Sequence, residues 1–217
     1  MKKIAAFTAA MVMCAGLAGC ASQKETYTDY IQCVLDCTYF GTMDKYMEMT
    51  ESTQEEAEEV YQSQVDYVKE LICYQYAVEI DYVSEETLDG YEALAKDIMA
   101  KVKYTVDPAE KSGDSYHITV NCEPIDLWDI TYDTVEEFYN GEFGDRYNAV
   151  TTEEELAELE EEYAVEVLDI VTAALPEMGY GEVQTKIVEI TVDEDGMYGI
   201  SDDDWLEIDD KLLNLSY

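Results

Sequence analysis

The stretch YHITVN, residues 116–121, alternates apolar and polar side chains. Because successive side chains of a strand point to opposite faces, this alternation predicts a strand with Ile118 and Val120 on a buried face. A second strand-like run, residues 103–106, lies just before it, and the turn residues 112–114 join the two. These strands decide the fold class, because most of the surrounding chain has the spacing of helices.

Apolar residues at helical spacing dominate the chain before these strands and predict helices over residues 27–40 and 44–49. Thr53 and Glu56 have the spacing of a capping box, in which a hydroxyl and a carboxylate each bind a free amide at the start of a helix. Ser84, followed by two glutamates, marks the start of another helix. The first half of the chain is therefore expected to form helices followed by a strand hairpin.

The same order begins again after the strands. Thr134 predicts the start of a short helix and Thr152 that of a long one, and strands are expected at residues 183–192 and 197–200. A last helix is expected after Ser201. We therefore predict an α+β fold in which helices pack on an antiparallel sheet.

The two halves also align with each other at a separation of about 100 residues. The matching pairs are Gly41 with Gly141 and the segment DKY at residues 44–46 with DRY at residues 145–147. This predicts a tandem duplication with one α+β repeat at residues 27–124 and another at residues 125–217. A unit of helices and one hairpin covers its own sheet poorly, so the repeats either share one sheet and core or form two lobes.

Residues 1–19 carry the pattern of a targeting signal. Two lysines are followed by an apolar run that is too short for a membrane-spanning helix, which needs about 20 apolar residues. The pattern ends in four residues that resemble the bacterial lipobox, namely Leu17, Ala18, Gly19 and Cys20. The alternative is an ordinary secretory signal in which the cysteine occurs by chance.

The resemblance to a lipobox implies cleavage before Cys20 and a diacylglyceryl lipid on its sulfur. Residues 20–26 then form a lipidated tether, and a lipid with two or more chains holds a protein stably at a membrane. We expect the protein on the outer face of the cytoplasmic membrane, with the membrane as a partner through this anchor.

The charge balance excludes one class of partner. The chain has 12 basic and 51 acidic residues, a formal charge of −39, and loss of the two lysines in residues 1–19 leaves 10 basic and 51 acidic residues, or −41. Nucleic-acid binding requires a basic surface, so a nucleic-acid partner is excluded. The simplest interpretation is a solvated acidic surface, and the alternative is a surface for divalent cations or a cationic partner.

Four cysteines follow Cys20, namely Cys33, Cys37, Cys73 and Cys122. Cys33 and Cys37 share one face of a predicted helix, which makes a bond between them difficult but leaves either able to reach one of the other two. Buried thiols are the favoured interpretation, and one or two disulfides are the alternative that an extracytoplasmic location allows.

Two segments resemble a known group of proteins. They are YFGTMDKY at residues 39–46, after a helix, and DGMYGI at residues 195–200, among late strands. This order is similar to that of the NTF2-like and cystatin-like modules of Gram-positive, clostridial-type surface lipoproteins, which are largely of unknown function. The resemblance implies a helix packed in the concavity of a curved antiparallel sheet, and it assigns no catalytic residue.

The sequence lacks the familiar motifs of serine hydrolases, zinc proteases and phosphate-binding loops. His117, the only histidine, is interpreted as an exposed strand residue, with a general base as the alternative; a nucleophile beside it would have to be Cys33 or Cys122. Arg146, the only arginine, is expected to form a structural ion pair with Asp145 or another nearby acid.

Asp193, Asp195 and Asp202 are weak candidates for calcium ligands. When Gly196 is placed at the turn glycine of an EF-hand loop, the first ligand position holds a threonine and the flanking helices are missing. A simple Asp-Gly hairpin turn explains the same residues without a metal. No cofactor other than the covalent lipid is therefore expected, with calcium as the alternative.

The leading functional hypothesis is a non-enzymatic, membrane-anchored extracytoplasmic module that binds or docks a protein or small molecule of the cell envelope. One alternative is an enzyme with tyrosine and carboxylate side chains in a pocket of the sheet concavity, and another is a calcium-stabilised surface protein. A closed cavity lined by a buried carboxyl with a raised pKa would favour the enzyme, whereas a solid apolar core would favour binding.

Overall fold

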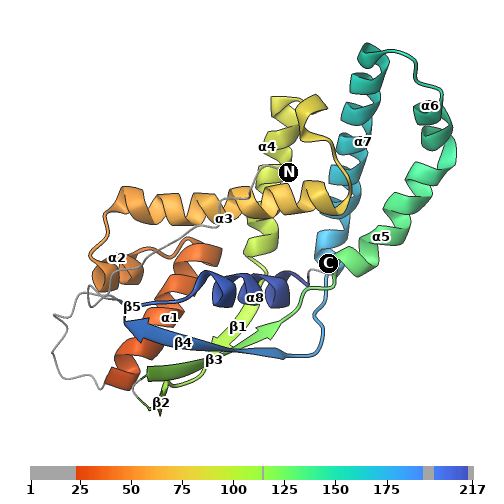
Figure 1. Ribbon diagram of the computed structural model, residues 1–217. Helices are drawn as coiled ribbons and strands as arrows, with labels where there is room; N and C mark the ends of the chain where they lie inside the picture. Colours follow the sequence, from red (N-terminus) through yellow and green to blue (C-terminus); the bar gives the residue numbers. More distant parts are fainter. Residues whose placement is uncertain (1–22, 114, 193–197, 215–217) are drawn as a thin grey trace. The chain divides into compact units, whose positions relative to one another are not determined.

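The computed structural model of the chain describes residues 23–113, 115–192 and 198–214 (Figure 1). The fold is α+β, with helices packed on an antiparallel sheet, as the sequence predicted. The described residues form two compact units. Unit 1 falls within Met1–Gln64, Val102–Pro124 and Gly181–Tyr217, and unit 2 comprises Val65–Lys101 and Ile125–Tyr180.

The boundaries of these units differ from those of the predicted repeats, residues 27–124 and 125–217. Each unit takes segments from both halves of the chain. Unit 1 holds the strands of both halves in one sheet, and unit 2 is helical. The tandem duplication itself stays a prediction.

The sheet of unit 1 is organised around β3 (Ser115–Glu123). It pairs antiparallel with β1 (Lys103–Val106), β2 (Glu110–Ser112) and β4 (Gln184–Val192). β5 (Tyr198–Gly199) pairs antiparallel with the end of β4. Because β3 belongs to the first half of the chain and β4 to the second, the central pairing of the sheet is a long-range one.

The alternation that was predicted for residues 116–121 is confirmed in β3. Ile118 and Val120 are fully buried, and the alternate residues His117, Thr119 and Asn121 are half-buried. β1 pairs with β3 as expected, but the turn at Gly113 joins β3 to β2 instead of β1. The sequence did not reveal β2 because all three of its residues are polar and exposed.

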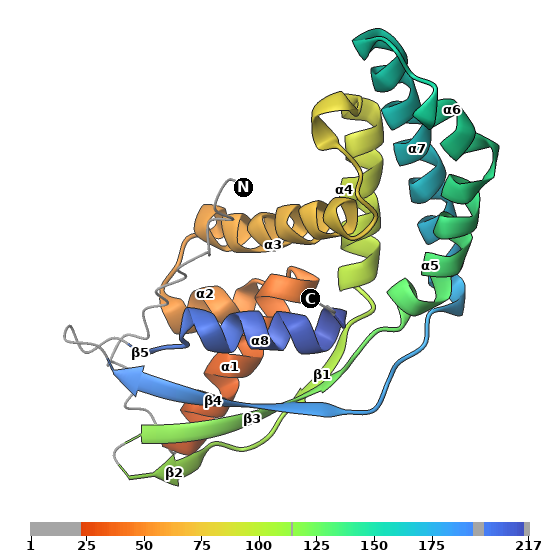
Figure 2. The same ribbon diagram turned by 45° about the vertical axis from the view of Figure 1, so that its right-hand side comes forward.

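One face of this sheet is covered by α1 (Gln23–Phe40) and α8 (Asp202–Leu213), and α8 runs beside β4 in both ribbon views (Figures 1 and 2). α2 (Asp44–Thr50) packs on α1. α3 (Gln54–Gln75) follows, and the boundary between the two units falls within it. The layer of helices closes the core of unit 1 over the apolar row of β3.

Local hydrogen bonds explain where the helices of unit 1 begin and end. Gly41, whose φ is 61°, follows α1 in the left-handed conformation that glycine adopts without strain. The capping box before α3 is confirmed: the backbone N–H of Thr53 donates to Oε2 of Glu56 at 2.7 Å, and the backbone N–H of Glu56 donates to Oγ1 of Thr53 at 3.3 Å. Ser201 caps α8 by accepting from the N–H of Asp204 at 3.1 Å.

Unit 2 consists of helices and tight turns. Beyond the second part of α3, its elements are η1 (Ile80–Tyr82), α4 (Glu85–Met99), α5 (Leu127–Phe138), η2 (Tyr139–Phe143), α6 (Gly144–Asn148), α7 (Glu153–Ala174) and η3 (Leu175–Glu177). α7 packs against both α4 and α5. Ser84 and Thr152 cap α4 and α7 with their side chains, as predicted.

The predicted helix start at Thr134 is wrong. Thr134 lies inside α5, which begins at Leu127. Asp126, which precedes this helix, is a residue type that favours helix starts, but its side chain makes no capping hydrogen bond and instead accepts from the backbone N–H of Gly179 at 2.7 Å. Among the described residues, no helix has the length and apolar character needed to cross a membrane.

Candidate functional site

Several of the predicted site residues lie outside the described part of the chain. They are the lipobox residues Leu17, Ala18, Gly19 and Cys20 and the calcium candidates Asp193 and Asp195. The third calcium candidate, Asp202, is an exposed residue in the first turn of α8. Within the described ranges, no three histidine, cysteine or acidic residues gather closely enough to hold a metal ion.

The four described cysteines are buried free thiols. Burial raises the pKa of Cys33 to about 12 and raises the pKa values of Cys37, Cys73 and Cys122 to about 11. Cysteine acts as a nucleophile through its thiolate, and a thiol with such a pKa carries almost none at neutral pH. These side chains therefore fill the interior.

The structure separates His117 from both cysteines that could have served beside it. His117 and Cys122 are five residues apart on β3, so they lie on opposite faces of the sheet, and Cys122 is fully buried. Cys33 packs within the helical layer, where its Sγ contacts the backbone oxygen of Tyr30 at 3.2 Å. Neither cysteine forms a pair with the histidine.

A buried carboxyl lies in unit 1. Asp209 of α8 leaves 2% of its surface exposed. Its Oδ1 accepts hydrogen bonds from the Tyr39 hydroxyl on α1 and, at 2.8 Å, from Nε2 of Gln64 on α3. Burial raises the pKa of Asp209 to about 7, and the hydrogen bonds from Tyr39 and Gln64 offset only part of that effect. These three residues are called the Asp209 cluster below.

Aromatic rings surround the Asp209 cluster. Trp205 stacks on Tyr39 with 6.5 Å between ring centroids, and the ring of Tyr104 lies 6.1 Å from that of Tyr39. The Tyr104 hydroxyl in turn donates to Oδ1 of Asp36 at 2.5 Å, and burial together with this bond raises the pKa of Tyr104. The carboxyl is therefore enclosed by packed side chains.

Unit 2 contains an open groove of about 570 Å³ beside the N-terminal ends of α4 and α7. Its lining residues are Asp81, Tyr82, Val83, Ser84, Glu154, Ala157, Glu158 and Glu161. Because four of these eight residues are carboxylates, we call it the acidic groove. Asp209 is not among them.

Glu161 ties α7 to the N-terminus of α4 at one side of this groove. Its carboxylate accepts from the backbone N–H and the hydroxyl of Ser84 and from the hydroxyl of Thr87, each at 2.7 Å. Partial burial alone would raise the pKa of Glu161, but these hydrogen bonds outweigh it and hold the pKa below its usual value. The positive end of α4 favours the same ionised form.

The remaining carboxylates of the acidic groove are Asp81, Glu154 and Glu158, and they make no ion pair within the described residues. The groove therefore offers negative charge around apolar side chains, an arrangement that suits the binding of a cationic group.

The ion pair that was expected for Arg146 is confirmed, and its partner is another acid than the adjacent Asp145. The guanidinium of Arg146 on α6 meets the carboxylate of Glu162 on α7 through two contacts of 2.6 Å. Asp145, the other acid considered, is not its partner in these contacts. The pair joins two helices, which is a structural role.

Sequence analysis missed the Asp209 cluster, although the sequence carries a signal for it. Asp209 follows Trp205 by four residues and therefore lies on the apolar stripe of α8. Gln64 lies on the apolar stripe of α3 in the same way, four residues after Val60 and four before Val68. A polar side chain at a stripe position indicates a buried polar group that needs a partner.

Comparison with known proteins gives a likeness of fold. No protein-family model matches the chain, and no curated protein matches it significantly. The chain resembles a solved structure from Bacillus subtilis subsp. subtilis str. 168, described as "a putative lipoprotein (ycdA)", with a TM-score of 0.56 and 13% sequence identity. The match covers 87% of this chain but only 57% of the other. At that identity the two proteins share a fold, and a shared fold does not specify an activity.

Proposed function

We propose that the protein is a lipid-anchored, extracytoplasmic docking module of the cell envelope that works by binding and not by catalysis. Two observations support the location: residues 17–20 resemble a lipobox, and the fold is shared with a Bacillus subtilis protein that is itself described as "a putative lipoprotein". Cys20 carries the lipid in this proposal. The predicted tether, residues 20–26, is shorter than expected, because α1 already begins at Gln23 and includes residues 23–26.

We assign unit 1 the NTF2-like or cystatin-like architecture that the sequence resembles. The support is that α1 packs on β1 and β3 of an antiparallel sheet. In this architecture the helix fills the concave side of the sheet, so that side serves as core. Binding then takes place at the surfaces and edges of the module.

The placement of one carboxyl favours binding over catalysis. Asp209, the buried carboxyl with the raised pKa, is held by Tyr39 and Gln64 among packed rings and is absent from the lining of the acidic groove. A general acid or base has to come within hydrogen-bond reach of a substrate proton. The carboxyl that an enzyme would use is therefore committed to holding α8 against α1 and α3.

Substitution of Cys20 tests the anchor. We expect the wild-type protein in the membrane fraction and labelled by radioactive palmitate, and the Cys20→Ser variant unlabelled and absent from that fraction. Cys14→Ser is the matched control, because it removes a thiol from residues 1–19 and leaves the lipobox intact. Retention and labelling of Cys20→Ser would overturn the proposed location.

A further inference from the structure

β4 presents an open edge within unit 1. On one side, β3 pairs with β4 in a continuous register over residues 184–190. On the other side, β5 pairs only with Thr191 and Val192, so residues 184–190 have no strand neighbour there among the residues that the structure describes. Figures 1 and 2 show β4 at the margin of the sheet with α8 alongside. A row of main-chain donors and acceptors is therefore left for another strand.

This edge carries only some of the usual protections against strand pairing. Proteins commonly block an edge with a proline, a bulge, charged side chains that point outward or inward, or a covering helix. β4 contains no proline, and its register with β3 is free of bulges. Its one lysine, Lys186, is held by an ion pair and only 13% of its side chain is exposed. On the opposite face, Ile187 leaves 58% of its surface exposed.

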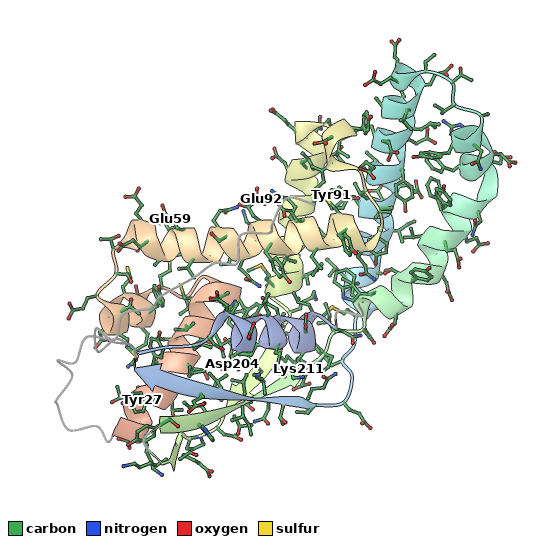
Figure 3. All side chains as sticks on the ribbon, viewed as in Figure 1. Tyr27, Glu59, Tyr91, Glu92, Asp204 and Lys211 are labelled. Atoms are coloured by element: carbon green, nitrogen blue, oxygen red, sulfur yellow. The ribbon has the colours of Figure 1, made fainter. Side chains whose placement is uncertain are left out.

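α8 supplies negative charge beside this edge. Nζ of Lys186 lies 2.8 Å from carboxylate oxygens of both Asp204 and Glu207. Asp204 is labelled on α8 in Figure 3. Lys186 shows that a basic side chain on the side of the sheet that faces α8 can bind the acidic residues of that helix. Asp202 and Asp203 in the first turn add further carboxylates that are exposed. The exposed row of β4 carries one charge, Glu189, and it is also acidic.

We propose that the open edge of β4 binds, by strand addition, an extended segment of another protein in which lysine or arginine alternates with apolar residues. The basic side chains lie beside α8, and the apolar side chains lie beside Ile187. This inference rests on the proposed docking function and names the chemistry of its partner. A second copy of the chain fits the edge less well, because it would bring its own acidic α8 against the first.

A synthetic peptide as long as β4, nine residues of alternating lysine and valine with blocked ends, is the probe. The control peptide has the same side chains but carries N-methyl groups on its central amides, so it keeps its charge and cannot form a strand ladder. Titration calorimetry with the purified full chain at about 0.15 M salt should detect binding of the first peptide alone. Hydrogen exchange should show new protection at residues 184–190.

Two protein variants separate pairing from charge attraction. Ile187→Lys removes the apolar contact and should weaken binding about fivefold, the upper end for one cross-strand pair. Thr105→Lys adds the same charge at an exposed position of β1 and should leave the affinity within about twofold. Equal losses in both variants, or equal binding of the methylated peptide, would overturn the proposal.

The edge would belong to a second copy if residues 184–190 became protected with rising protein concentration in the absence of peptide, while light scattering showed a dimer. That result would also overturn the proposal. The Cys20→Ser experiment does not depend on β4, so failure of the strand-addition proposal can be distinguished from failure of the anchor.

Discussion

Asp209 in unit 1 and Glu161 in unit 2 are both carboxyls that accept hydrogen bonds from the chain, but their pKa values move in opposite directions. Asp209 is almost completely buried and receives two donors, and burial raises its pKa to about 7. Glu161 is half-buried and receives three donors, one of them a backbone N–H at a helix N-terminus, and its pKa is lowered.

The difference shows that burial and donor number act against each other. Two donors do not replace the water that Asp209 loses, so the folded protein favours its neutral form. Three donors and the end of α4 suffice for Glu161, so the folded protein favours its ionised form. The two carboxyls therefore stabilise their units in opposite ranges of pH, which makes the comparison testable.

The largest expected effect is the pH dependence at Asp209. Its folded pKa lies above the usual 3.8, so its full contribution to stability is present below about pH 4 and is lost as the pH rises through about 7. A pKa difference of this size between the folded and unfolded states corresponds to about 4 kcal/mol of unfolding free energy. Asp209→Asn keeps an acceptor for Tyr39 and Gln64 but cannot ionise. Urea unfolding should show the variant as more stable than wild type at pH 8 and about equal at pH 4.

The matched control is Asp203→Asn, which removes one exposed charge from the same helix. It should not reproduce the change between the two pH values. A constant difference between Asp209→Asn and wild type at both pH values would show that Asp209 has an ordinary pKa. The contrast with Glu161 would then disappear.

Removal of one donor from Asp209 sharpens the comparison. Tyr39→Phe leaves Gln64 as the only described donor to the carboxyl and should cost about 1–3 kcal/mol of unfolding free energy. The loss should be larger at pH 8 than at pH 5, because the ionised form depends more on its donors. Tyr74→Phe, at a tyrosine with 75% of its surface exposed, is the control and should change stability by less than about 0.5 kcal/mol. A loss that did not vary with pH would mean that Tyr39 contributes packing alone.

The elements that sequence predicted best are those fixed by contacts within four residues. Thr53, Ser84, Thr152 and Ser201 were each placed correctly at a helix start, because a cap is a bond between a side chain and an amide two or three residues away. Thr134 failed because the same residue pattern also occurs inside a helix, and the signal that Asp126 gives at the true start of α5 was overlooked.

The contacts that sequence could not supply are the long-range ones. Tyr39 and Asp209 are 170 positions apart, and nothing in the local pattern pairs them. The apolar stripe of α8 shows that Asp209 is turned inward, but the partner depends on how α1, α3 and α8 pack over the sheet. The open edge of β4 likewise follows from the strand order, which local alternation does not encode.

A smaller effect is expected at Glu161. Glu161→Gln weakens the bonds to Ser84 and Thr87 and should cost about 1–2 kcal/mol at pH 7. Because its pKa is lowered, the contribution of Glu161 is present above the usual carboxyl pKa and is lost as the pH falls through the lowered value, so variant and wild type should converge in acid. Glu158→Gln, in the same groove, is the control and should have little effect. Thermal unfolding at pH 7 and pH 3 measures both, and a loss of similar size at both pH values would contradict this account.

The smallest expected effect concerns calcium. The carboxylate of Glu161 accepts hydrogen bonds from the hydroxyls of Ser84 and Thr87. Within the described residues, no group of acidic side chains is arranged to hold a metal ion. We therefore expect thermal unfolding in millimolar calcium and in chelator to give the same midpoint to within about 1 °C, because calcium raises the midpoint only if it binds the folded state.

The decisive variants are Asp193→Asn and Asp195→Asn. A calcium-dependent rise in the midpoint that either of them abolished would establish a site at the predicted Asp-Gly turn and would add a third kind of carboxyl to the two compared above.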